Sequence, residues 1–172
     1  MTSERLGFRT WTISDMPLAK ELWGDPRVTQ FIDARGRLSE VQVEERLARE
    51  ISCLEAYGIQ YWPIFLLNDA AFVGCCGLRP HKMEARIYEI GVHIIPENWR
   101  RGYAREACLA VMSFAFGNLM VGALFAGHNP KNDISRNLLL KLGFRYTHDE
   151  YYPATGLNHP SYLLTAEDFV QR

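Results

Sequence analysis

The fold is decided by the stretch Glu97-Asn98-Trp99-Arg100-Arg101-Gly102-Tyr103-Ala104-Arg105-Glu106-Ala107, which joins an apolar run to a helical pattern. Residues 88–95 are largely apolar and stop at Pro96, as expected of a buried strand. Apolar residues then recur at helical spacing, at Ala104, Ala107, Cys108, Val111, Met112 and Ala115. The basic, glycine-containing turn is therefore predicted to begin a helix.

Such a turn has the chemistry of an anion site. The first amides of a helix are unpaired and carry partial positive charge, Gly102 has no side chain to block the backbone, and Arg100 and Arg101 add full charges. A pyrophosphate group fits these donors, although an ordinary capped helix has the same outline. Neither GxGxxG nor GxxxxGK followed by Ser or Thr occurs, so the dinucleotide and P-loop versions of such a site lack their motifs.

The letters of the turn resemble a known pyrophosphate loop. Residues 99–104 read WRRGYA, which is similar to the Q/R-x-x-G-x-G/A loop of the GCN5-related N-acetyltransferases (GNAT), with Trp99 where Gln or Arg is usual. The longer string PENWRRGYAREA is similar to the WGxGYAxEA loop of the RimJ/RimL-type ribosomal-protein N-terminal acetyltransferases. Arg100 replaces the first Gly of that pattern, which adds positive charge beside a polyanion.

A second block, residues 132–144, resembles the NxxSxxxxxKxGF segment of the same family. From the residues alone, Asn132 or Asp133 can cap a helix and Gly143 is a natural stop before the next strand, which opens at Phe144. The spacing also places three apolar residues on one helix face, namely Ile134, Leu138 and Leu142.

The remaining patterns predict the order β-α-α-β-β-β-α-β-α-β-β, which is that of the family. Strands are predicted near residues 6–13, 61–67, 72–78, 86–95, 121–126, 144–152 and 161–164, and helices near 14–24, 39–57, 104–115 and 132–142. Ser39 and Gln42 form a capping box for the second helix. The resemblance implies the GNAT fold: an α/β (α+β) single domain over residues 1–172, with a mixed, mostly antiparallel sheet of six to seven strands and about four helices.

The composition argues against several classes of binding partner. The chain has 172 residues, of which 48% are hydrophobic and 23% charged, and its formal net charge of −1 offers no footprint for nucleic acid or an anionic membrane. Four cysteines form no CxxC pair and no zinc spacing with histidine, so no metal site is expected. The N-terminus lacks a signal peptide's apolar core and no apolar run reaches about 18 residues, so a cytoplasmic protein is expected.

The resemblance implies direct transfer of an acetyl group from acetyl-CoA to a primary amine. The residues that it assigns to acetyl-CoA are Arg100, Arg101, Gly102, Tyr103 and Ala104 at the phosphates, Asn132 and Ser135 along the cofactor arm, and His93, Ile94 and Ile95, one of whose amides would polarise the thioester carbonyl.

The attacking amine must lose a proton, and Glu89 is the predicted base. It lies in Tyr88-Glu89-Ile90-Gly91, which resembles the AEIGY stretch of the family, and an acid in an apolar strand is costly unless it is used or paired. An ion pair with Arg79 or Arg86 is the competing interpretation. His93, four residues on along the same strand face, is the second candidate for the base, or else a structural histidine.

The departing CoA thiolate gains a proton. Many family members place a Tyr seven residues after the loop Asn, and here that position is Leu139. The resemblance leaves Ser135, or a water held by Asn132, as the acid, and Ser135 acting only in the first turn of its helix is the alternative. An acyl-enzyme is disfavoured, because no cysteine stands in a recognisable nucleophile arrangement with histidine.

The acceptor is predicted to be a protein N-terminal amine or another primary amine. A small-molecule amine, such as a polyamine, an amino acid or an antibiotic, is the alternative, as is a non-catalytic acyl-CoA-binding module. The aromatic residues that could line the acceptor site, or simply fill the core, are Trp23, Phe31, Tyr61, Tyr152, His159 and Tyr162. A monomer or a homodimer is expected, with the loop at 155–162 over the acceptor or against a second subunit.

Overall fold

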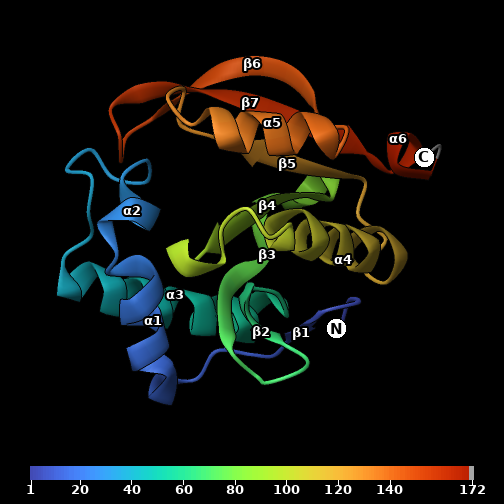
Figure 1. Ribbon diagram of the computed structural model, residues 1–172. Coiled ribbons are helices and arrows are strands. Elements are labelled where there is room, and N and C mark those ends of the chain that lie inside the picture. Colours follow the sequence, from blue (N-terminus) through green and yellow to red (C-terminus); the bar gives the residue numbers. More distant parts are fainter. Residues whose placement is uncertain (171–172) are drawn as a thin grey trace.

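The computed structural model describes residues 1–170, and its strands form one seven-stranded sheet (Figure 1). The strand order is β1-β2-β3-β4-β5-β7-β6, and β4 and β5 are the one parallel pair within the described residues. The mixed, mostly antiparallel sheet predicted above is thus confirmed. The strands are β1 (Leu6–Phe8), β2 (Tyr61–Leu66), β3 (Phe72–Lys82), β4 (Ile87–Ile94), β5 (Ala123–Gly127), β6 (Arg145–Tyr152) and β7 (Leu157–Thr165).

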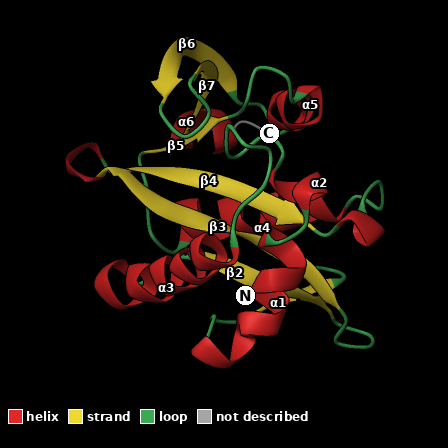
Figure 2. Cartoon of the chain, turned by 90° about the vertical axis from the view of Figure 1, so that its left-hand side faces the viewer, coloured by secondary structure: helices red, strands yellow, loops and turns green. Residues whose placement is uncertain are grey.

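Helices cover both faces of this sheet. The helices α1 (Met16–Trp23), α2 (Pro26–Thr29) and α3 (Glu40–Tyr57) come before β2, and Figure 2 shows α1 and α3 together beside β2 and β3. The helices α4 (Tyr103–Gly117) and α5 (Asp133–Lys141) belong to the opposite face, in front of the strands in Figure 1. The short α6 (Ala166–Val170) follows β7.

Two apolar clusters hold these layers together. On one face, α4 packs its apolar stripe against even-numbered residues of β4 and β5, including Ile90, Ile94 and Leu124. On the other face, α1 and α3 enclose Trp11, Trp23, Tyr61 and Cys75. Because strand side chains alternate, the odd-numbered residues of β4 face the α1–α3 side.

The parallel pair separates early. Its register joins Ile87 to Ala123, Tyr88 to Leu124 and Glu89 to Phe125, and no further β4–β5 partners follow among the described residues. β4 nevertheless continues to Ile94 in pairing with β3. The carboxyl ends of β4 and β5 therefore diverge directly after Glu89.

Helix ends follow their predicted signals. In the capping box of α3 the Ser39 hydroxyl accepts from the Gln42 N–H at 3.3 Å, while Gln42 Oε1 accepts from the Ser39 N–H at 2.9 Å. The helix ends at Gly58, whose φ is +71°. Asn132, rather than Asp133, caps α5.

Two apolar residues lie outside the core, contrary to the sequence pattern. Ile13 is 72% exposed in a 3-10 turn instead of in β1, because Asp15 accepts from the Thr12 N–H at 2.8 Å and turns the chain there. Ile134 is 80% exposed, because α5 begins only at Asp133 and reaches the core one turn later. The final hairpin turn is also shorter than predicted, since β7 begins at Leu157.

Candidate active site

The basic turn before α4 is open and left-handed. Gly102 is the N-cap of α4 with a φ of +83°, and a Cβ there would meet only the Arg5 side chain, at 3.4 Å. The first α-helical hydrogen bond of α4 runs from the Glu106 N–H to the Gly102 carbonyl, so the amides of Tyr103 and Ala104 have no acceptor inside the helix. These donors, with no side chain at Gly102 to obstruct them, fit a pyrophosphate.

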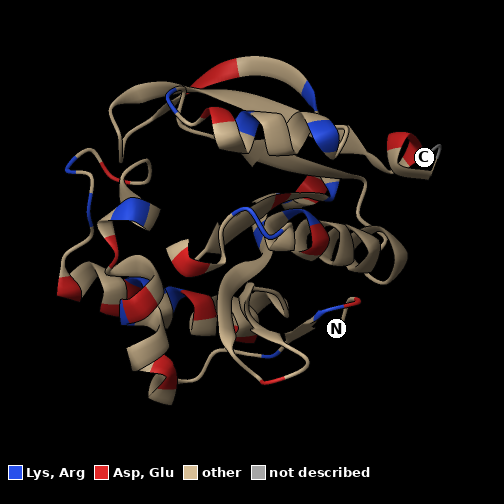
Figure 3. Cartoon of the chain, in the orientation of Figure 1, with Lys and Arg blue, Asp and Glu red and all other residues tan. Residues whose placement is uncertain are grey.

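Arg100 occupies a conformation that favours glycine. Its φ is +61°, although it is not a glycine, and its side chain is exposed. This is the position at which the RimJ/RimL-type loop, which the sequence resembles, has Gly. Figure 3 shows the turn into α4 as a basic segment, whereas charges of both signs are interspersed over the rest of the ribbon.

The first turn of α4 is tied to the N-terminal segment by Glu106. Its carboxylate accepts from the Ser3 hydroxyl at 2.7 Å and from the Arg5 N–H at 2.8 Å, and it pairs with the Arg5 guanidinium at 2.6 Å. Partial burial acts to raise the pKa of Glu106, but these hydrogen bonds outweigh it and lower that pKa. The helix start is thus held in place without covering the open amides.

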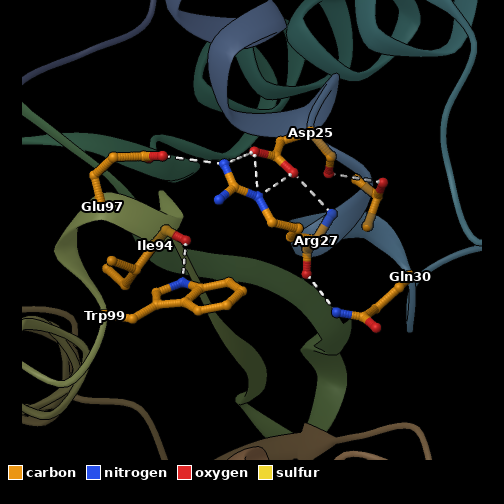
Figure 4. A network of polar contacts seen from close by, with 7 residues as sticks. Asp25, Arg27, Gln30, Ile94, Glu97 and Trp99 are labelled. Atoms are coloured by element: carbon orange, nitrogen blue, oxygen red, sulfur yellow. Dashed lines mark hydrogen bonds and ion pairs between the residues drawn. The ribbon is translucent and has the colours of Figure 1, made fainter.

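The other end of the turn is tied to α2 and β4 (Figure 4). The indole N–H of Trp99 donates to the Ile94 carbonyl at 2.8 Å. Glu97 pairs with Arg27 at 3.0 Å, and Arg27 also pairs with Asp25 at 2.6 Å. The approach to the basic turn is therefore anchored at both α2 and the end of β4.

Backbone alternation decides which amide of residues 93–95 can meet a thioester. The Ile95 N–H donates to the Val73 carbonyl at 3.0 Å, so odd-numbered residues of β4 direct their amides at β3. The amides of Val92 and Ile94 consequently face the side from which β5 has diverged. Of the three predicted residues, Ile94 is the one whose N–H faces that gap.

Glu89 stands at the last paired position before the gap. Its Oε1 accepts a hydrogen bond from the Tyr61 hydroxyl at 2.9 Å, and the side chain is half-buried. The predicted ion-pair alternative is wrong: Arg79 pairs with Glu50, and Arg86 donates to main-chain carbonyls after α4. The carboxylate is therefore held by a neutral donor.

His93 is fixed in one tautomer. The indole N–H of Trp23 donates to His93 Nδ1 at 3.0 Å, and since an indole N–H can only donate, Nδ1 accepts and the proton resides on Nε2. Burial lowers the pKa of His93 well below its usual value, and Arg46 and Arg79 lower it further. A neutral imidazole that carries its proton on Nε2 can donate there but has no lone pair at that atom to act as a base.

The second block brings Asn132 and Ser135 together. Asn132 Oδ1 accepts from the Ser135 N–H at 3.1 Å, so this pair forms the capped first turn of α5. The Ser135 side chain is half-buried, and Leu139 is 8% exposed within the core. The loop before α5 is braced by Asn129, which donates to the Phe31 carbonyl at 3.3 Å.

The predicted aromatic set divides between core and surface. Trp23, Tyr61, Tyr162 and His159 are buried, and Tyr152 is 44% exposed. Of these, sequence reasoning did not give Tyr61 or Trp23 a role toward Glu89 or His93. No periodic signal could have done so, because each contact joins residues far apart in the chain.

The cysteines offer no nucleophile. Cys75 Sγ lies 3.9 Å from His93 Nδ1, a proximity that the sequence did not indicate, but burial raises the pKa of this thiol to about 12. Cys76 and Cys108 are buried with their sulfur atoms 3.9 Å apart. Within the part of the chain that the structure describes, no cluster of three His, Cys, Asp or Glu residues could hold a metal ion.

Comparison with known proteins identifies the family. The model of the acetyltransferase (GNAT) domain matches residues 5–145. The chain belongs to the GNAT acetyltransferase family. Its relatives include the protein named Uncharacterized N-acetyltransferase YoaA, from Bacillus subtilis strain 168, which is 27% identical over 152 residues, covering 84% of this chain and 82% of YoaA.

Solved GNAT structures share the fold at low identity. RimL, a ribosomal alpha-N-protein acetyltransferase in complex with coenzyme A, superposes with a TM-score of 0.81 at 14% identity and 98% coverage of both chains. A spermidine N-acetyltransferase from Vibrio cholerae, in complex with CoA and spermine, has a TM-score of 0.79 at 15% identity, covering 96% of this chain and 98% of that one. This protein is thus an acetyl-CoA-dependent N-acetyltransferase, with acetyl-CoA as its cosubstrate.

No helix within residues 1–170 combines the length and the apolar character that a membrane crossing requires.

Proposed function

We propose that the acetyl group moves directly from acetyl-CoA to a primary amine in the gap where β4 and β5 diverge, with Glu89 as the base. The observation that carries this proposal is the end of the β4–β5 pairing at Glu89. One strand thus presents a carboxylate and, five residues later, the Ile94 amide beside the same gap, and the basic turn begins where β4 ends. Ligands of open sheets with parallel strands bind at such carboxyl ends.

The groups around the gap bind acetyl-CoA and polarise its thioester. The amides of residues 101–104, with the Arg100 and Arg101 side chains, hold the phosphates, and Asn132 and Ser135 contact the cofactor arm. The Ile94 N–H donates to the thioester oxygen as negative charge develops on it, a contribution of about 3 kcal/mol in other enzymes.

Protons and bonds balance without an acyl-enzyme. Glu89, directly or through a water, takes a proton from the ammonium form of the acceptor, and the free amine attacks the thioester carbon. The carbon–sulfur bond breaks, and the thiolate takes a proton from the Ser135 hydroxyl or from a water beside Asn132. That donor is reprotonated by the second proton, which the attacking nitrogen loses as it becomes an amide. Glu89 releases its proton to solvent before the next turnover. His93, with its proton on Nε2, serves as a hydrogen-bond donor in this scheme.

The acceptor that we infer is a protein N-terminal amine, as in the RimJ/RimL-type branch. A polyamine carries several positive charges and needs free carboxylates, yet three carboxylates between residues 25 and 50 already have arginine partners. Asp25 pairs with Arg27, Asp33 with Arg35, and Glu50 with Arg46 and Arg79. A single ammonium group suits Glu89, whose hydrogen-bond partner is the neutral Tyr61 hydroxyl.

The experiment is thiol release from acetyl-CoA with a matched panel of amines. Peptides with a free N-terminus are compared with the same peptides blocked by N-terminal acetylation but carrying a lysine, and with spermidine and free amino acids. The proposal expects release with the free-N-terminus peptides above all. Thiol release with spermidine alone would assign a polyamine acceptor. No thiol release with any amine, despite binding of CoA, would indicate a non-catalytic module.

A further inference from the structure

Tyr61, the first residue of β2, is held on all sides although it carries no assigned role. It is 3% exposed, and its hydroxyl donates to Glu89 Oε1 at 2.9 Å. Its backbone N–H donates to Glu50 Oε2 at 2.9 Å, and Glu50 itself is fully buried. Arg46 and Arg79 both pair with Glu50, so the backbone of Tyr61 is fixed by a buried charge cluster from α3 and β3.

The ring of Tyr61 is clamped as well. The guanidinium carbon of Arg79 lies 4.4 Å from the ring centroid and that of Arg46 lies 5.6 Å from it. The His93 ring meets the Tyr61 ring edge-on, with 6.0 Å between the ring centroids. Packed in this way, the Tyr61 ring directs its hydroxyl toward β4.

Gly91 makes room for that hydroxyl. A Cβ at Gly91 would lie 2.2 Å from the Tyr61 hydroxyl oxygen, a distance that no side chain tolerates. Gly91 has ordinary strand pairing with Gly77, and no left-handed φ explains its lack of a side chain. Any side chain at position 91 would therefore displace the Tyr61 ring and hydroxyl from the place where they meet Glu89.

Tyr61 can only be a donor to Glu89 in the working range of pH. Burial raises the pKa of the Tyr61 hydroxyl well above its usual value, and the neighbouring Glu89 raises it further. The charged and titratable groups around the pair are Arg46 and Glu50 from α3, Arg79 from β3, and His93 from β4.

We propose that Tyr61 is a positioning residue for the base: it occupies Oε1 of Glu89 so that Oε2 is presented to the acceptor amine. The inference rests on the proposed role of Glu89. The fixed geometry keeps the carboxylate oriented for proton transfer.

The test is Tyr61→Phe, which removes one oxygen atom, with Tyr57→Phe as the matched control at an exposed tyrosine of α3. We expect Tyr61→Phe to lower kcat about 10- to 100-fold. The KM for acetyl-CoA should stay unchanged. Tyr57→Phe should match the wild type. A folded Tyr61→Phe enzyme with a wild-type kcat would overturn the proposal.

A double variant separates this inference from the proposed function. If Tyr61 acts through Glu89, Tyr61→Phe should have no further effect on kcat in a Glu89→Gln background. Equal losses in both backgrounds would show that Tyr61 is merely structural. If Glu89→Gln alone has a wild-type kcat, the proposed base itself fails.

Should Tyr61→Phe fail to fold, site-specific 3-fluorotyrosine at position 61 keeps the ring and makes the hydroxyl a stronger donor. The kcat should then differ from that of the wild type, because the strength of the hydrogen bond to the proposed base has changed, while the KM for acetyl-CoA stays unchanged. A kcat identical to that of the wild type would refute the positioning role.

Discussion

At Gly102, the effect of an added side chain on backbone strain can be measured separately from its effect on ligand binding. Gly102 has a φ of +83°, and nothing in the protein lies closer than 3.4 Å to a Cβ placed there. Gly58, at the end of α3, has a φ of +71° and open space around its Cβ position. Gly102→Val and Gly58→Val should therefore cost similar stability, about 1–2 kcal/mol or somewhat more for a β-branched residue. For a chain of this size that corresponds to a loss of roughly 2–8 °C in Tm.

Only Gly102→Val should affect acetyl-CoA. A valine side chain would project where the amides of residues 101–104 receive the pyrophosphate, and losing one charge-assisted hydrogen bond costs about 1.5–3 kcal/mol, or roughly 10- to 150-fold in Kd. Isothermal titration of acetyl-CoA into both variants, below their Tm values, measures the difference. A folded Gly102→Val protein that binds acetyl-CoA as tightly as Gly58→Val does would refute the phosphate assignment.

Two further predictions concern the same turn. Arg100→Gly should raise Tm by about 1–4 °C. Removing the strain of a left-handed non-glycine residue stabilises the folded state by about 1–2 kcal/mol, which exceeds the stabilisation of the unfolded chain by its added freedom, about 0.4–1 kcal/mol. An unchanged or lower Tm in thermal unfolding would show that Arg100 is not strained. For Glu106, the folded pKa is below its ordinary value of 4.5, so the stability that it contributes is present above that pH and is lost as pH falls through the folded pKa. The Tm difference between wild type and Glu106→Gln should thus be largest near neutral pH and shrink below about pH 4.5. A Tm difference that does not vary with pH would show that the Arg5–Glu106 contact contributes no charge-dependent stability.

Local patterns predicted most of the helices and strands. The capping box of Ser39 and Gln42 and the glycine that begins α4 each depend on residues within one turn of one another. Signals of such short range can be recognised directly in the sequence. The strand and helix order of the family followed from the same signals.

The chemistry of the site depends on contacts that periodicity does not specify. An alternating pattern shows that Glu89 and His93 share a strand face, but the donor that meets each is set by the packing of α1 on that face and by the register of β2 within the sheet. Tyr61 reaches Glu89 from 28 residues away, and Trp23 reaches His93 from 70. The same limit explains Ile13 and Ile134, whose apolar character favoured burial that the local turn and the late start of α5 prevent.

The effect of Arg100 on the turn follows from the sequence and the structure together. The sequence revealed only that Arg100 replaces a glycine of the loop that it resembles, whereas the structure shows that Arg100 has a φ of +61°, a conformation that favours glycine. Arg100 therefore adds a positive charge to the turn and strains its backbone.

The most direct test of Glu89 as the base compares the wild type with Glu89→Gln, measuring the Kd for acetyl-CoA and kcat for an accepted amine on the same preparations. Glutamine keeps the shape of the side chain and can still accept from the Tyr61 hydroxyl, but it cannot take a proton from the amine. The account predicts a Kd within about twofold of the wild type and a kcat lowered at least about 100-fold. A Glu89→Gln enzyme with wild-type kcat across the pH range would contradict it.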